Sequence, residues 1–195
     1  LYAVAKMLYL EMLRHGITHV AEFHYLHHDT SGSPYEDLGL MGEVLLRASH
    51  EVGIKITLIP VMYQRADYGE KISLRQKRFH TKDLETYQRI WEAIAAKLNK
   101  YPLAQMGLGI HSLRAVEEDI AKQFFNSSWT KSLIDIHHLP IHLHAAEQKR
   151  EVERSLYFVK KTPIRWLLEH INLSKNHQLV HATHDRRARH GLPAA

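Results

Sequence analysis

The segment Ile54–Tyr63 (IKITLIPVMY) is apolar at nearly every position, which severely limits how this chain can fold. A run of this length without polar alternation is typical of a strand buried on both faces. Such strands occur almost only in α/β proteins, where helices cover both sides of a parallel sheet. We therefore expect a parallel sheet enclosed by helices.

The remaining apolar patterns alternate between two periods. Period-two and β-branched runs predict further strands at Thr18–Tyr25, Gln105–His111, Pro140–Ala145 and Gln178–Ala182. Helical spacing predicts helices at Tyr2–His15, Tyr35–Val52, Asp83–Asn99, Glu117–Phe125 and across Lys149–His170. The polar segment Gln64–Thr81 is predicted to be a long loop. Strands that alternate with helices in this way indicate βαβ units.

Five parallel strands fit either a doubly wound sheet or part of a barrel. Polar residues follow the carboxyl end of almost every predicted strand, and barrel enzymes place their catalytic residues at that rim. An open sheet would gather them mainly at a topological switch point. The pattern favours a partial TIM-type (β/α)8 barrel of about five parallel strands with intervening helices.

Composition excludes several classes of protein. The chain has no cysteine, so only histidine and carboxylate remain as metal ligands, and this absence fits a cytoplasmic protein. The sequence contains no run of about eighteen apolar residues, so it predicts no membrane span. The net charge of +5 is spread along the chain without an aromatic-interleaved basic patch, which argues against nucleic acid. The count of 17 histidines is unusually high.

The segment His142-Leu143-His144-Ala145-Ala146-Glu147 carries the strongest chemical signal. Residues two apart in a strand face the same way, so His142 and His144 share one side. An imidazole at a strand end can bind a divalent metal, and a carboxylate three residues later can move the proton of a metal-bound water. The alternative is that both histidines are packed polar residues and Glu147 only opens a helix.

Three weaker signals lie at other strand ends. His181 ends an apolar strand, although a single histidine there is often structural. Arg114 follows His111 by three residues and offers a planar fork of donors for a substrate carboxylate, or else a surface ion pair. His27 and His28 could bind a metal, but a histidine-rich loop without a role is the favoured interpretation.

Four segments together resemble the successive strand ends of one family, the formimidoylglutamate deiminase branch of the amidohydrolase superfamily. The segments are AEFHYLHHD (Ala21–Asp29), GLGIHSLRAV (Gly107–Val116), PIHLHAAEQ (Pro140–Gln148) and LVHATH (Leu179–His184). The resemblance covers residues 1–184 as a partial metal-dependent hydrolase barrel. Residues 185–195 (DRRARHGLPAA) form a tail that does not match.

This resemblance implies a mononuclear zinc enzyme of histidine degradation. The enzyme hydrolyses N-formimidoyl-L-glutamate, a small substrate with carboxylates, to N-formyl-L-glutamate and ammonia. By the same resemblance, His144 would be a metal ligand, Glu147 the proton shuttle and His181 the residue that orients the attacking water. Substrate binding would fall to Tyr25, His111 and Arg114. The resemblance also allows a homodimer for the complete protein.

Two parts of the family pattern are absent. That family takes two metal ligands from a His-x-His at the end of its first strand, whereas this chain begins with Leu1 in what resembles the following helix. The aspartate that ends the eighth strand is expected beyond residue 195. We therefore expect an internal fragment, which alone neither binds zinc tightly nor has deiminase activity.

Two alternatives remain open. One is another amidohydrolase deaminase that acts on a ring or purine-like substrate, which would not need Arg114 as a carboxylate partner. The other is a non-catalytic fragment without a specific ligand.

Overall fold

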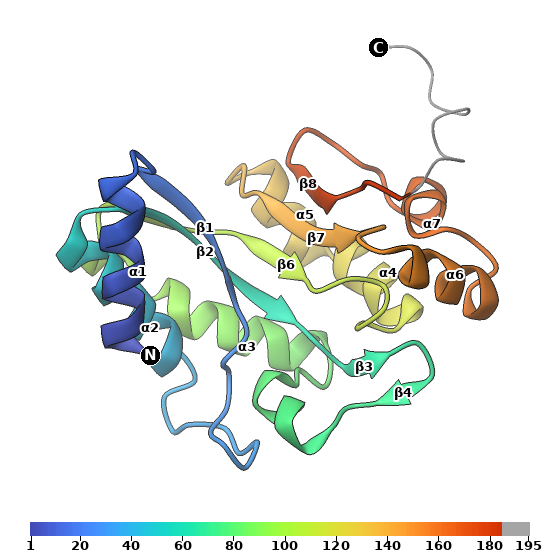
Figure 1. Ribbon diagram of the computed structural model, residues 1–195, viewed down its shortest axis with the longest axis horizontal. Helices are drawn as coiled ribbons and strands as arrows, with labels where there is room; N and C mark the ends of the chain where they lie inside the picture. Colours follow the sequence, from blue (N-terminus) through green and yellow to red (C-terminus); the bar gives the residue numbers. More distant parts are fainter. Residues whose placement is uncertain (185–195) are drawn as a thin grey trace. The chain divides into compact units, whose positions relative to one another are not determined.

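The computed structural model describes residues 1–184, and the predicted tail of residues 185–195 lies outside the described residues (Figure 1). The chain divides into two compact units. Unit 1 comprises Leu1–Met62 and Ser73–Gly109, and unit 2 comprises Tyr63–Ile72 and the described residues from Ile110 onward.

Unit 1 is built on parallel strands. These are β1 (His19–His24), β2 (Lys55–Met62), β5 (Ala104–Met106) and the start of β6 (Leu108–Ile110). Both β1 and β5 pair in parallel with β2. Every residue of β2 after Lys55 is buried, as its apolar sequence predicts. Between β5 and β6, the N–H of Gly107 donates to the carbonyl of Leu58 at 2.8 Å, which keeps the chain beside β2.

Helices cover these strands in unit 1. They are α1 (Tyr2–Arg14), α2 (Leu40–Val52), the 3-10 helix η1 (Leu74–Phe79), α3 (Leu84–Ala95) and the 3-10 helix η2 (Leu98–Lys100). α1 packs beside α2 (Figure 1). α2 ends at Gly53, whose φ of 84° favours glycine. α3 begins after Asp83, whose carboxylate accepts the N–H of Thr86 at 2.8 Å.

Two buried aromatic side chains attach α3 to the strands of unit 1. The Tyr87 hydroxyl donates to the carbonyl of Pro60 at 3.0 Å and accepts the N–H of Gly109 at 3.1 Å. The Trp91 indole N–H donates to the carbonyl of Gly107 at 2.9 Å. These bonds give hydrogen-bond partners to polar groups that burial separates from water.

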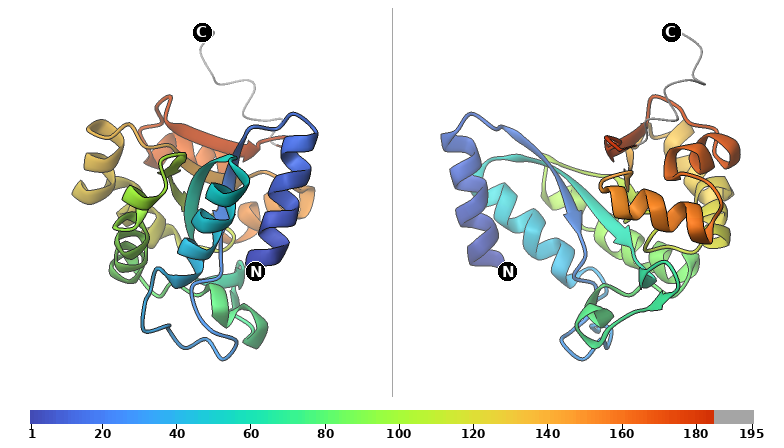
Figure 2. Two further views of the ribbon diagram at one scale, coloured as in Figure 1. Left: turned by 90° about the vertical axis from the view of Figure 1, so that its left-hand side faces the viewer. Right: turned by 45° about the vertical axis from the view of Figure 1, so that its right-hand side comes forward.

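Unit 2 contains a hairpin, two parallel strands and four helices. They are β3 (Arg65–Asp67), β4 (Glu70–Lys71), α4 (Glu118–Asn126), α5 (Ser128–Asp135), β7 (Ile141–Ala145), α6 (Lys149–Phe158), α7 (Pro163–His170) and β8 (His177–His181). β3 and β4 are antiparallel. β7 and β8 lie side by side and parallel, with Ala145 opposite His181 (Figure 2).

The predicted alternation of strands and helices is present, with local differences. Part of the predicted loop Gln64–Thr81 forms the β3–β4 hairpin and η1, and Gln105–His111 forms two short strands. α2 begins five residues after the predicted Tyr35, because the Asp37 carboxylate accepts the N–H of Gly39 at 2.9 Å and holds a turn there. Within residues 1–184, no helix combines the length and apolar character needed to cross a bilayer.

Candidate active site

The carboxyl ends of β7 and β8 meet at one edge of unit 2. The two strands are parallel and paired up to Ala145 and His181, so the residues that follow them emerge together. Past this point, the N–H of Ala182 donates to the carbonyl of Ala145 at 2.8 Å. This pairing places Glu147, two residues beyond β7, next to the end of β8.

The backbone is strained at this edge. Ala146, His181 and Ala182 have φ values of 51°, 73° and 51° respectively. Residues other than glycine rarely adopt positive φ, and such positions concentrate at functional sites. Here the turned backbone directs the segments after both strands toward each other.

His144 is half-buried at the end of β7, and its tautomer follows from its hydrogen bond. Its Nδ1 lies 3.0 Å from the carbonyl oxygen of His111. A carbonyl can only accept, so Nδ1 carries the proton and the lone pair resides on Nε2. Burial lowers the pKa of His144, which favours the neutral imidazole that a metal requires.

His111 lies beside His144 after β6. The two ring centroids are 5.2 Å apart, and the Tyr63 ring contacts His111 edge-on, also at 5.2 Å between centroids. Burial and the nearby Arg114 guanidinium lower the pKa of His111 to about 3. His111 is therefore a neutral imidazole at physiological pH, able to form hydrogen bonds without carrying a charge.

Glu147 lies between a guanidinium and an imidazole. Its Oε2 is 3.6 Å from Nη2 of Arg114, and its Oε1 is 3.7 Å from Nε2 of His181. The ring of His181 is in turn 5.5 Å from that of His144. The structure thus brings His111, Arg114, His144, Glu147 and His181 together in unit 2.

Glu151 binds the backbone of this cluster and belongs to no recognised sequence motif. It is 2% exposed, and its two carboxylate oxygens accept the N–H groups of Ala146 and Glu147 at 3.2 Å and 2.9 Å. Burial raises the pKa of Glu151, and the two backbone donors oppose that rise. The position four residues after Glu147, on the first turn of α6, is the only clue the sequence offers.

Tyr25 belongs to unit 1. It follows β1, and its ring contacts Phe79 edge-on, with the centroids 6.0 Å apart. Its predicted role in the substrate pocket stays a prediction.

The histidines after Tyr25 have structural contacts. Nε2 of His27 lies 2.9 Å from the carbonyl oxygen of Val61, and Nε2 of His28 lies 2.7 Å from that of His80. Both nitrogens must carry protons, so neither can donate a lone pair to a metal in this state.

The donor set at the edge of unit 2 suits part of a metal site. The lone pair on Nε2 of His144 is the kind of ligand that zinc prefers, and His181 and Glu147 lie close by. Among residues 1–184, however, no three histidine or carboxylate side chains are arranged as a complete metal-binding group. His144 is therefore one candidate ligand, with His181 and Glu147 close by.

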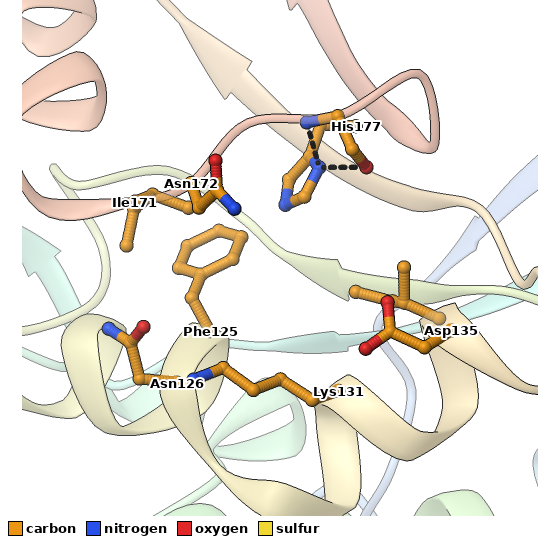
Figure 3. A pocket seen from close by; sticks show the side chains of 9 residues that line it. Phe125, Asn126, Lys131, Asp135, Ile171, Asn172 and His177 are labelled. Carbon is orange, nitrogen blue, oxygen red and sulfur yellow. Dashed lines mark hydrogen bonds between the residues drawn. The ribbon is translucent and has the colours of Figure 1, made fainter.

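A separate cavity lies at the opposite end of β8. Its volume is about 300 Å³, and His177, the first residue of β8, lines it (Figure 3). Nδ1 of His177 accepts the N–H of Ser174 at 3.0 Å, and the ring stacks on Phe125. None of the predicted site residues lines this cavity.

Comparisons with known proteins match the chain over most of its length. The amidohydrolase family matches residues 1–184. The formimidoylglutamate deiminase of Pseudomonas aeruginosa is 36% identical over 182 residues, which are 93% of this chain and 38% of that protein. The crystal structure of an amidohydrolase from Brucella melitensis is 38% identical with a TM-score of 0.84, and covers 94% of this chain and 39% of its own.

A more distant structure shares the fold. The atrazine chlorohydrolase of Arthrobacter aurescens, solved in complex with zinc, is 17% identical with a TM-score of 0.64 over 91% of this chain and 36% of its own. The chain therefore spans less than two fifths of these relatives. The comparisons confirm the resemblance to the deiminase branch and the fold class: five parallel strands with helices between them, as part of a (β/α)8 barrel.

Proposed function

The chain belongs to the amidohydrolase family, and from this we propose that it forms the central part of an amidine hydrolase. The proposed reaction converts N-formimidoyl-L-glutamate and water to N-formyl-L-glutamate and ammonia. The observation that carries the proposal is the position of Glu147, within 3.6 Å of Arg114 and 3.7 Å of His181 beside His144. The 36% identity to the Pseudomonas deiminase supports the same substrate.

His144 would hold a divalent metal through Nε2. A bound Zn²⁺ lowers the pKa of a water ligand, so that hydroxide is available near neutral pH. The zinc in the atrazine chlorohydrolase structure, which shares this fold, is consistent with that choice. The remaining ligands would come from parts of the complete protein outside this chain, because catalytic zinc needs about three protein ligands.

Glu147 would move the proton during the reaction. It would take one proton from the attacking water and then the remaining hydroxyl proton of the tetrahedral intermediate, and would deliver both to the amidine nitrogen, so that the C–N bond breaks and ammonia departs rather than an amide anion. His181, 3.7 Å from Glu147, would orient the same water. The hydrogen bonds from Ala146 and Glu147 to Glu151 keep the shuttle in place.

Arg114 would bind a carboxylate of the substrate. Its side chain is 22% exposed and its Nη2 lies 3.6 Å from Glu147, so the guanidinium can donate to a second carboxylate. His111 and Tyr25 are the proposed further contacts. A neutral ring or purine substrate would offer this guanidinium no carboxylate besides that of Glu147, which is why we favour the glutamate derivative.

Ammonia release from a set of substrates tests the proposal. The protein to assay is the complete polypeptide of which we propose this chain to be a part. We expect turnover of N-formimidoyl-L-glutamate and none of aminated purines or triazines. Turnover of a ring substrate in place of the amidine would contradict the proposed function.

A further inference from the structure

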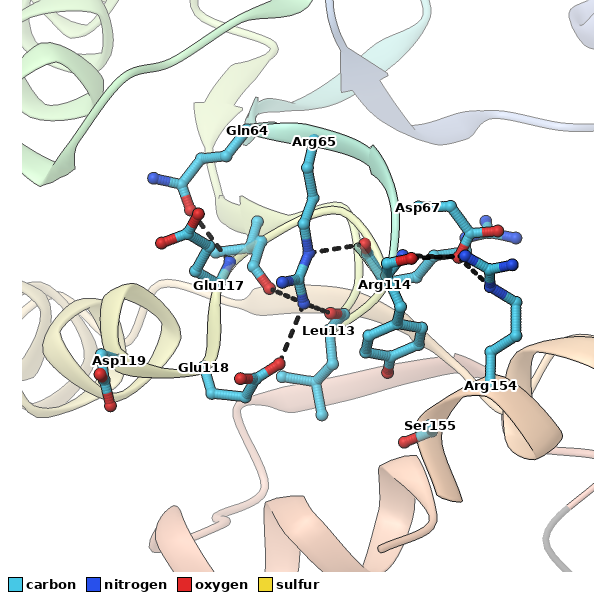
Figure 4. A network of polar contacts seen from close by, with 12 residues as sticks. Gln64, Arg65, Asp67, Leu113, Arg114, Glu117, Glu118, Asp119, Arg154 and Ser155 are labelled. Atoms are coloured by element: carbon cyan, nitrogen blue, oxygen red, sulfur yellow. Dashed lines mark hydrogen bonds and ion pairs between the residues drawn. The ribbon is translucent and has the colours of Figure 1, made fainter. Parts of the chain in front are cut away.

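We propose that Arg65 is a positioning residue that holds Arg114 in place for substrate binding, an inference that rests on the proposed function. Arg65 lies on β3 of the hairpin, in a segment whose sequence predicts only a loop. Its side chain is 17% exposed and reaches the loop between β6 and α4, which carries Arg114 (Figure 4).

The Arg65 guanidinium binds the backbone of that loop. Its Nε donates to the carbonyl of Arg114 itself at 3.0 Å. Its Nη2 lies 2.8 Å from the carbonyl oxygen of Leu113, 3.2 Å from that of Val116 and 3.0 Å from a carboxylate oxygen of Glu118. A guanidinium offers donors in a rigid plane, so these bonds define the path of the loop.

Arg65 and Gln64, the residue before β3, form further bonds to the same loop. The N–H groups of Gln64 and Arg65 both donate to the carbonyl of Ala115, at 2.8 Å and 3.0 Å. The Gln64 side chain accepts the N–H of Glu117 at 3.1 Å. Four consecutive carbonyls, those of residues 113 to 116, therefore bond to Arg65 and to Gln64, the residue before the hairpin. The loop has no regular secondary structure, so these bonds supply the hydrogen-bond donors that a helix or a sheet would otherwise give its carbonyls.

The other end of the hairpin is attached to α6. Nε of Arg154 lies 3.1 Å from Asp67 (Figure 4). Its Nη2 lies 2.9 Å from Glu70. The same guanidinium donates to the carbonyl of Tyr68. α6 also carries Glu151, which binds the backbone N–H of Glu147.

The hairpin consequently connects the two segments that present the site. Arg65 holds the loop of Arg114, and Arg154 ties the hairpin to the helix that holds the backbone of Glu147. The 3.6 Å separation of the Arg114 guanidinium and the Glu147 carboxylate depends on both connections. Loss of the Arg65 bonds would displace the Arg114 guanidinium from the substrate carboxylate, so that substrate binding becomes weaker.

The first test measures the loop in this chain without reference to activity. Arg65→Met removes every guanidinium donor, and Arg65→Lys keeps the charge without the planar fork. Arg75→Met, at an exposed position, is the matched control. We expect Arg65→Met to speed hydrogen exchange of the amides at residues 115–117 by at least about tenfold, because their protecting structure opens. Arg75→Met leaves those rates unchanged.

The second test measures steady-state kinetics in the complete protein. We expect Arg65→Met to raise KM for N-formimidoyl-L-glutamate by at least about tenfold and to change kcat by less than about threefold. In an Arg114→Met background, Arg65→Met should raise KM no further, since the two residues act through one contact. Arg65→Lys should recover part of the loss, and serves as the test variant if Arg65→Met does not fold.

The outcomes separate the inference from the proposed function. An unchanged KM in Arg65→Met, or an equal increase with and without Arg114, would overturn the inference while wild-type turnover upholds the function. A decrease in kcat with an unchanged KM would also overturn the inference. Such a result is what a general structural defect produces, because it lowers the fraction of active protein. Faster exchange at residues 115–117 in a protein that does not hydrolyse the amidine would overturn the function, and with it the substrate-binding part of the inference.

Discussion

Each carboxylate oxygen of Glu151 has its own hydrogen-bond donor, so the loss of one oxygen is expected to lower stability. Its two oxygens each accept one backbone N–H at the strained turn after β7, and the side chain is 2% exposed. Glu151→Gln replaces one carboxylate oxygen by an NH2 group, which can only donate, and so leaves a backbone N–H without its partner. We expect the free energy of unfolding to fall by about 1–3 kcal/mol in urea denaturation. Glu153→Gln, exposed on the same helix, is the control, and equal losses in both variants would refute this role.

His27 makes the stability of the chain depend on pH. Burial lowers its pKa to about 4, its Nε2 donates to Val61, and its buried Nδ1 has no hydrogen-bond partner among the described residues. The unfolded chain binds a proton near its ordinary pKa of about 6.5, whereas the folded chain resists protonation until about pH 4. Stability is therefore fully present above pH 6.5 and is lost as the pH falls toward 4, by about 3 kcal/mol from this residue.

Urea denaturation between pH 7 and pH 4 checks this dependence. His27→Gln, which can still donate to Val61, should show a smaller loss of stability over that range than the wild-type chain. His137→Gln, at an exposed position, should match the wild type. A wild-type slope in His27→Gln would show that the imidazole is not responsible.

The sequence predicts the residues of the cluster because each lies at a recognisable position, the carboxyl end of a predicted strand. His111, His144 and His181 each end or follow a predicted strand, and parallel strands bring such residues to one edge. Arg65 binds backbone carbonyls of a loop that is distant in sequence, and Glu151 binds the backbone N–H groups of Ala146 and Glu147. No local pattern reveals such partners, so the sequence alone could not identify them.

The β3–β4 hairpin depends on Gly69 at its turn. Gly69 has a φ of 70°, and a Cβ there would lie 2.8 Å from Cε1 of Phe158. We expect Gly69→Ala to destabilise the chain by about 1–2 kcal/mol in urea denaturation, because an L side chain strains this conformation. Phe158→Ala would remove the contact and leave the backbone strain. Lys71→Ala, also in the hairpin, should be neutral, and a neutral Gly69→Ala would contradict the assigned turn.

Apolar periodicity decides which elements the sequence predicts. The run in β2 and the amphipathic pattern of α3 are long and clear, and both elements form within a few residues of the predicted bounds. The hairpin has few apolar residues and is stabilised by ion pairs to Arg154 and by Arg65, so its segment resembles a loop. Polar elements held by distant partners lack the signal that apolar strands carry.

At the scale of the whole molecule, zinc binding reports how much of a metal site this chain contains. His144 is its proposed ligand, and residues 1–184 contain no complete group of three donors. We expect calorimetric titration of the 195-residue chain with Zn²⁺ to show no one-to-one site of about micromolar affinity or tighter. The complete protein should bind one equivalent, and His144→Ala should weaken that binding. A tight one-to-one site in the chain alone would contradict this division of ligands.

The role of Glu147 as the proton shuttle beside His181 is the central claim. The kcat of the complete protein for ammonia release tests this role directly. Glu147→Gln in the complete protein, compared with Glu153→Gln at equal zinc content, should lower kcat for N-formimidoyl-L-glutamate by about 10²–10⁴-fold. Glu153→Gln should retain the wild-type rate. A Glu147→Gln variant that releases ammonia within about twofold of the wild-type rate would contradict the proposed active site.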